Sequence, residues 1–190
     1  ISSATPYSIV GMDGWDTSNV TNMESMFDEA GNGPKVWSIG DLSNWDVSKV
    51  TNMERMFASA GRFAKVFSIG NLGEWDVSKV TNMRNMFYFT GCCAEMFTPG
   101  DLSKWDVSKV TDMYCMFYSS GRDADGWFIG DISEWDTSNA VIMASMFNSA
   151  GQYATYTIKL DLSGWNVSNV TSYSTFNNYV TDKITSPKFG

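Results

Sequence analysis

Acidic side chains are the groups in this chain most able to do chemistry, because the sequence contains no histidine. Asp123 and Asp125 form a close pair inside a variable segment, and paired carboxylates can act as general acid and base in glycoside hydrolysis. The sequence has no Gly-rich phosphate loop, and no serine or cysteine lies beside an evident base. We therefore predict that the chain is not an enzyme, and we interpret the pair as solvated loop residues.

Aspartates also recur at an even spacing along the chain, at Asp46, Asp76, Asp106 and Asp136. If successive copies stack, these like charges repel one another unless an ion or hydrogen-bond donors compensate, so Ca²⁺ between copies is one alternative. The local sequence W-D-V-S-K suits Asx and Ser turns, which already supply backbone donors, and the repeat lacks the Gly-rich spacing of calcium-binding solenoids. We favour turn capping and expect no metal or other cofactor, while the calcium alternative stays open.

Three cysteines, Cys92, Cys93 and Cys115, lie away from the positions that the copies share. Their spacing shows neither a disulfide framework nor a metal motif. A Cys93–Cys115 disulfide remains an alternative, but three thiols leave one over, and a small free cysteine often serves only in packing.

The tryptophans set the register of the whole chain, because they recur without a break in the spacing at Trp15, Trp45, Trp75, Trp105, Trp135 and Trp165. This interval falls within the range of about 20–50 residues that is typical of solenoids, in which no copy buries its apolar face alone and neighbours stack into one continuous core. We predict a single repeat domain of six coils over residues 1–177, with an irregular entry over residues 1–14. Residues 178–190 leave the pattern and are interpreted as a C-terminal cap or tail.

Composition excludes several classes of partner. The formal net charge is −8 and the Lys and Arg residues form no run, which argues against nucleic acid and anionic membrane surfaces. No apolar stretch approaches the roughly 18–20 residues that span a bilayer, so we expect no direct membrane insertion.

Each copy has two halves of different periodicity. In the first half Val50, Met53, Met56, Phe57 and Ala60 fall on one face of a short predicted helix, Thr51–Gly61. Thr51 and Glu54 would form its capping box, and Gly61 would be the left-handed residue that ends it.

The second half, Lys65–Leu72, is predicted to be a short parallel strand that ends the series as Ile158–Leu162. Gly40, Gly70, Gly100 and Gly130 are interpreted as strand bulges. Strands stack about 4.8 Å apart and helices about 8–10 Å apart, so the predicted α/β solenoid should curve with its strands inside.

The tryptophan column allows two interpretations. A stripe of flat rings could stack on sugars, but a residue kept in every copy is better explained by packing between coils. We assign to a structural ladder the residues Trp45, Trp75, Trp105, Trp135, Met53, Met56 and Phe57.

Specific binding is expected where the copies differ. Tyrosine and arginine predominate among interface hot spots, and aromatic rings offer a large contact area at a small ordering cost. The predicted ligand-binding residues are Arg62, Phe63, Tyr88, Phe89, Tyr118, Arg122 and Tyr153. Neutral drift of surface positions is the alternative.

The phrase D-L-S-x-W-D-V/T-S-x-V-T-x-M-x-x-M-F resembles the repeat of BspA-like leucine-rich-repeat surface proteins, including the mycoplasma-type surface lipoprotein repeat. It matches best at Asp41–Phe57, Asn71–Phe87, Asp101–Phe117 and Asp131–Phe147. The copies depart from it at Gly73, which replaces a serine, and in three segments that look like lengthened loops: Arg62–Val66, Cys92–Met96 and Arg122–Gly126.

The resemblance implies a leucine-rich-repeat-like fold and a secreted or cell-surface protein. Such a protein would adhere, without catalysis, to a protein or glycan on a host or neighbouring cell. A passive spacer within a larger surface protein is the alternative function.

Overall fold

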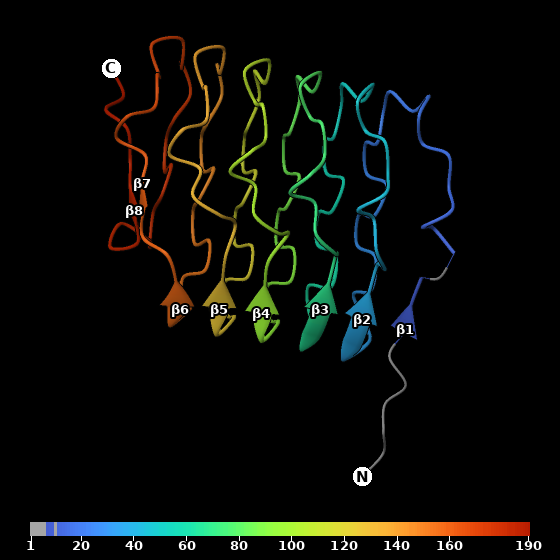
Figure 1. The fold of residues 1–190 in the computed structure, drawn as a ribbon. Coiled ribbons are helices and arrows are strands. Elements are labelled where there is room, and N and C mark those ends of the chain that lie inside the picture. Colours follow the sequence, from blue (N-terminus) through green and yellow to red (C-terminus); the bar gives the residue numbers. More distant parts are fainter. Residues whose placement is uncertain (1–6, 10) are drawn as a thin grey trace.

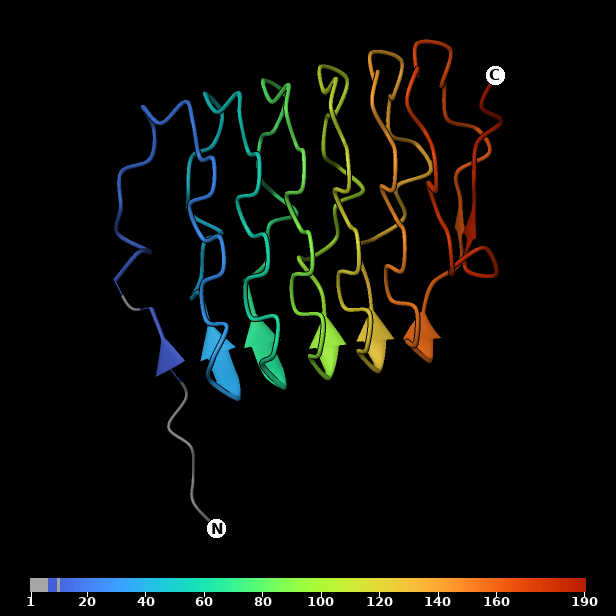
Figure 2. The same cartoon turned by 180° about the vertical axis from the view of Figure 1, so that it is seen from behind.

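The computed structural model describes residues 7–9 and 11–190, so the predicted entry over residues 1–14 lies partly outside the described residues. The chain winds into coils, one for each copy of the repeat, that stand side by side from the N-terminal to the C-terminal end (Figure 1). The view from behind shows the same single row (Figure 2). A single cluster of buried hydrophobic residues runs through the described part of the stack.

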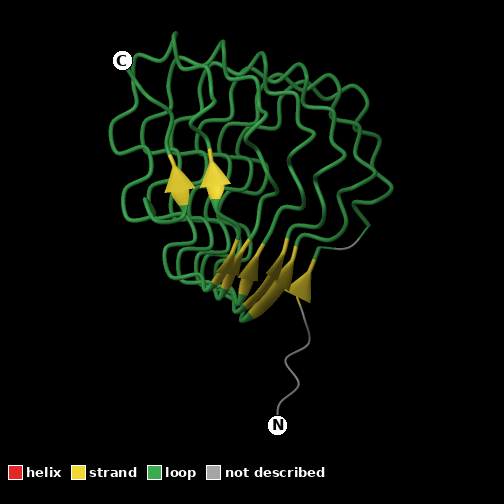
Figure 3. Cartoon of the chain, turned by 60° about the vertical axis from the view of Figure 1, so that its left-hand side comes forward, coloured by secondary structure: helices red, strands yellow, loops and turns green. Residues whose placement is uncertain are grey.

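Short parallel strands line one edge of the stack (Figure 3). The first sheet contains β1 (Tyr7–Ser8), β2 (Val36–Ser38) and β3 (Val66–Ser68), and the second contains β4 (Met96–Phe97), β5 (Gly126–Trp127) and β6 (Tyr156–Thr157). A third sheet pairs β7 (Leu160–Asp161) with β8 (Ile184–Thr185). Within each of the first two sheets, partners occupy equivalent positions of successive copies, as in Trp37 beside Phe67. The repeat period of the sequence therefore sets the pairing of residues between neighbouring strands in these two sheets.

The predicted helix in each coil is wrong, because no helix occurs among the described residues. In Thr51–Gly61 the backbone N–H groups of Met53, Arg55 and Phe57 donate to carbonyls of the following coil, each at 2.9 Å. Between them, Met56 N–H closes a tight turn on the Met53 carbonyl at 3.2 Å, and Glu54 N–H donates to Asn52 Oδ1 at 3.0 Å. Arg55 and Ser59 have positive φ angles of 55°. The segment is a run of turns that is stacked on its neighbours.

The periodicity nevertheless identified the buried face. Met53, Met56, Phe57 and Ala60 are all fully buried, so their spacing marks the positions that face the core whether the backbone is helical or turned. A helix satisfies its own donors, whereas this segment uses carbonyls that exist only because the next copy repeats the same backbone.

The helix caps were wrong for the same reason. Thr51 Oγ1 donates to the Thr21 carbonyl of the preceding coil at 3.2 Å, and Glu54 accepts from Asn82 Nδ2 at 3.0 Å. The predicted curvature assumed that helices on one side of each coil are spaced more widely than strands on the other. Backbone hydrogen bonds instead join successive coils in both halves of the repeat, so this reason for curvature no longer applies.

The predicted bulges are also corrected. Gly40 follows β2 instead of interrupting it, has a φ of 99°, and donates its N–H to Ser38 Oγ at 3.0 Å. Gly70, Gly100 and Gly130 repeat this positive φ. These glycines turn the chain at the end of the strand edge.

Aromatic columns fill the interior. The rings of Phe27, Phe57, Phe87, Phe117 and Phe147 stack in sequence with centroids 5.3–5.6 Å apart. At the C-terminal end Val180 and Ile184 are buried, and Lys183 Nζ donates to the carbonyls of Gly151, Gln152 and Ala154 at 2.7–2.9 Å. Val180, Lys183 and Ile184 thereby pack against the C-terminal end of the stack. None of the described residues forms a helix long and apolar enough to cross a membrane.

Candidate functional site

The tryptophan column lies inside the stack. Trp45, Trp75, Trp105 and Trp135 are only 3–4% exposed. Each indole N–H donates at 2.9–3.0 Å to a carbonyl of the preceding coil, as Trp105 does to Leu72. These four rings therefore offer no face to a sugar. Trp15, which is 53% exposed and stacks on Trp45, is the exception at the N-terminal end.

The recurring aspartates lie in turns that precede the stacked segment of each coil, as Asp46 precedes Thr51–Gly61. Oδ1 of Asp46, Asp76 and Asp136 accepts the N–H of the serine two residues later at 2.9–3.1 Å. Hydrogen bonds from the Ser48 hydroxyl and N–H hold the pKa of Asp46 below its ordinary value. The predicted Asx turn at Asp46 is confirmed, so the carboxylate has a structural role in this turn.

Five of the predicted binding residues come together on one flank of the stack. The rings of Tyr88 and Tyr118 stack with centroids 5.2 Å apart, and Phe89 contacts both at 4.7 and 5.5 Å. The Arg62 guanidinium carbon lies 4.1 Å from the centre of the Phe89 ring and 5.2 Å from that of Phe63. We call these five residues the aromatic cluster.

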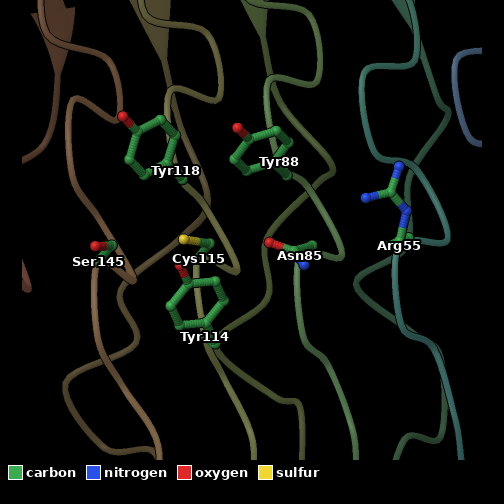
Figure 4. A pocket seen from close by; sticks show the side chains of 7 residues that line it. All are labelled: Arg55, Asn85, Tyr88, Tyr114, Cys115, Tyr118 and Ser145. Carbon is green, nitrogen blue, oxygen red and sulfur yellow. The ribbon is translucent and has the colours of Figure 1, made fainter. Parts of the chain in front are cut away.

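A shallow cavity of about 350 Å³ opens beside the two stacked tyrosines. Its lining comprises Arg55, Asn85, Tyr88, Tyr114, Cys115, Tyr118 and Ser145 (Figure 4). In the close-up, Tyr88 and Tyr118 lie next to each other on adjacent coils, above Asn85 and Cys115.

Divergence between copies pointed to Arg55, Tyr88, Tyr114 and Tyr118, but sequence reasoning missed three cavity residues, Asn85, Cys115 and Ser145. Arg55, Asn85, Cys115 and Ser145 occupy the same position in successive copies, and all four have a positive φ of 52–56°. Their exposure to a cavity depends on the stacked turns, which the predicted helix did not contain. Their divergence from copy to copy was the signal available in the sequence.

Neutral polar groups dominate the cavity. Burial raises the pKa of both the Tyr88 phenol and the Cys115 thiol. A raised pKa disfavours the thiolate, which is the nucleophilic form of cysteine. Arg55 is engaged by Asp28 at 2.7 Å, so its charge is already paired. The lining is suited to stacking and hydrogen bonding with a ligand.

The other two predicted binding residues, Arg122 and Tyr153, lie in the corresponding loops of later coils, at positions equivalent to Arg62 and Phe63. Arg122 pairs with Asp123 through two contacts of 3.1 and 2.9 Å, which lowers the pKa of Asp123. Tyr153 is 64% exposed, and its N–H donates to the Arg122 carbonyl at 2.9 Å. Asp125 is exposed in the same loop.

The loops of two adjacent coils also bring together side chains whose proximity the sequence did not predict. Cys92 and Cys93 both contact Asp123, and all three cysteines are free thiols, so the structure does not contain the Cys93–Cys115 alternative. Cys115 lies instead at the cavity.

The comparisons with known proteins agree with the repeat architecture. No curated protein and no solved structure matches the chain. The family model described as "Mycoplasma protein of unknown function, DUF285" matches residues 3–125 and again residues 89–183. Two overlapping matches are expected when a repeated unit fills a chain. Together they cover nearly the whole sequence, and the chain therefore belongs to the DUF285 family.

Proposed function

We propose that this chain is a non-catalytic binding module, secreted or displayed on a cell surface, that recognises a protein or glycan through the aromatic cluster. The observation that carries the proposal is the partly exposed contact of Tyr88, Phe89 and Tyr118 beside an open cavity. Large rings already held in place by one another bind a partner with little further loss of side-chain entropy.

The cluster is not a requirement of the repeat. Positions equivalent to Tyr88 and Tyr118 carry Asp28, Ala58 and Asn148 in the other coils. A residue needed for stacking would recur in every copy, as the tryptophan does. The tyrosines are therefore a local feature of two adjacent coils.

The surface location is proposed from two sources. Membership of the DUF285 family supports a mycoplasma-type repeat protein. The finer resemblance of the phrase around Asp41–Phe57 to BspA-like leucine-rich-repeat surface proteins supports an adhesive role towards a host or neighbouring cell. In this proposal the strand edge of the stack corresponds to the strands of a leucine-rich repeat, with turns in place of helices.

A passive spacer is the second candidate function. The observation in its favour is the backbone ladder that continues from coil to coil, in which Lys65, Glu95 and Asp125 each donate to the preceding coil at 2.8–3.0 Å. Such a ladder would hold other domains at a fixed separation whatever its surface displays.

The experiment that separates the two candidates replaces Tyr88 and Tyr118 together with alanine. Binding of the purified chain to cells and to a glycan array should weaken by at least about tenfold, the typical effect of losing hot-spot side chains. Tyr156→Ala is the matched control, because Tyr156 is an exposed tyrosine on the strand edge, outside the cluster. Binding that is unchanged in the double variant favours the spacer.

A further inference from the structure

Two adjacent thiols point at one carboxylate. Consecutive side chains of an extended chain face opposite ways. Cys92 and Cys93 instead lie in a tight turn, in which Cys92 N–H donates to Phe89 and Ala94 N–H to Gly91. Their sulfur atoms lie 3.7 and 3.8 Å from the same atom, Asp123 Oδ2. Sγ of Cys92, Sγ of Cys93 and a carboxylate oxygen of Asp123 all lie within 4.8 Å of one another.

The backbone ladder fixes this arrangement from both sides. Cys93 N–H donates to the Arg62 carbonyl of the preceding coil at 3.1 Å, and Asp123 N–H donates to the Cys92 carbonyl at 2.8 Å. The turn and the carboxylate are thus held in register before any ligand arrives.

We propose that Cys92, Cys93 and Asp123 bind one thiophilic divalent cation, of which Zn²⁺ and Cd²⁺ are the test cases. A zinc ion lies about 2.3 Å from sulfur and about 2.0–2.2 Å from a carboxylate oxygen. Tetrahedral angles then require sulfur–oxygen separations of about 3.5–3.7 Å and a sulfur–sulfur separation of about 3.8 Å. The observed sulfur–oxygen distances of 3.7 and 3.8 Å need almost no adjustment.

Charge balance agrees with this assignment. Arg122 holds Asp123 in its ionised form through two hydrogen bonds. Two thiolates and a carboxylate carry three negative charges, and the divalent cation together with Arg122 supplies three positive ones. Cysteine binds a metal as the thiolate, so both thiols must lose their protons and each ion bound releases up to two protons to solvent.

Access and divergence support a site over simple packing. Cys92 is 2% exposed, Cys93 is half-buried and Asp123 is exposed, so the group opens to solvent at the carboxylate and leaves a fourth position for water. At the positions of the two cysteines, the preceding coil carries Arg62 and Phe63 and the following coil carries Arg122 and Asp123. The repeat therefore does not require thiols there.

The test titrates the full, reduced chain with Cd²⁺ and follows the ultraviolet charge-transfer band between thiolate and metal. We expect one ion per chain, up to two protons released per ion, and competition by Zn²⁺. Cys93→Ser and Asp123→Ala should each lower the affinity at least about tenfold, since even outer-shell changes at metal sites cost that much.

Two further variants keep the result decisive. Cys115→Ser is the matched control, because this third thiol lies at the cavity and should leave the titration unchanged. Cys93→Phe copies Phe63 of the preceding coil, so it should fold like the parent and still lose the ion. The proposal is overturned if the parent chain shows no charge-transfer band, or if Cys93→Phe binds as tightly as the parent.

Discussion

Glycines at the entrance of the lengthened loops let aromatic rings of adjacent coils pack against bare backbone. Gly61, predicted as a left-handed residue, has a φ of 56°, which confirms that conformation although no helix precedes it. At the equivalent Gly91, with a φ of 53°, an added Cβ would lie 2.8 Å from Phe67 and 2.9 Å from Phe97.

Gly91→Ala should therefore destabilise the protein for two reasons. A left-handed conformation costs a non-glycine residue about 1–2 kcal/mol, and overpacking of a core adds about 1–3 kcal/mol. We expect the free energy of unfolding in urea to fall by about 2–5 kcal/mol. Gly164→Ala is the control, because nothing lies within 4 Å of a Cβ there. Equal stability of the two variants would contradict the packing described here.

At the residue scale, the sequence predicted a side chain's role correctly where that side chain forms hydrogen bonds with residues close to it in the sequence. Asp46 and Ser48 bond two residues apart, so a local pattern predicts them. The meeting of Cys92 and Cys93 with Asp123 depends on a turn and on stacking against the next copy, so no local pattern contains it.

At the scale of elements, the sequence predicted which positions are buried but not the path of the backbone between them. Met53, Met56 and Phe57 satisfy a helical spacing and are buried. The free energy that selects turns over helix comes from hydrogen bonds to the next coil, such as Arg55 to Arg84. A predictor that considers one copy alone cannot include it.

The turns at Asp46, Asp76 and Asp136 make the stability of the protein depend on pH. Hydrogen bonds from serine lower the pKa of Asp46, Asp76 and Asp136 below the ordinary value of 3.8. A carboxylate whose pKa is lowered by folding stabilises the folded state above its unfolded pKa, and this contribution is lost as the pH falls through the folded pKa. We therefore expect the free energy of unfolding, measured in urea, to decline once the pH drops below about 4.

A triple variant with asparagine at these three positions isolates the effect. Asparagine keeps the turn acceptor, as Asn166 shows by accepting Ser168 N–H at 3.1 Å. Stability at pH 7 should change little, and the loss between pH 5 and pH 3 should be smaller than in the parent chain. An identical loss in parent and variant would assign the acid sensitivity to other groups.

At the scale of the whole molecule, a common period makes the coils exchangeable. The backbone of each coil bonds to its neighbours at equivalent positions, as Thr51, Thr81 and Thr111 each donate to the corresponding threonine of the preceding coil at 2.8–2.9 Å. The sequence predicted this stacking because the spacing of the repeat can be read directly from the residues. It named the residues of the aromatic cluster, but it could not predict their mutual contacts or the cavity, which depend on the turns that stacking selects.

Removing residues 136–165 deletes one full period and joins Trp135 to Asn166, which restores the original order of columns. We expect a folded chain whose urea m value is lower by about one sixth, because m scales with the surface exposed on unfolding. Removing only residues 136–150 joins Trp135 to Gly151 and leaves half a coil, so the columns on either side no longer meet. Although it loses fewer residues, the shorter deletion should be the less stable of the two. If it proved the more stable, the stack would not be held by the register of its coils.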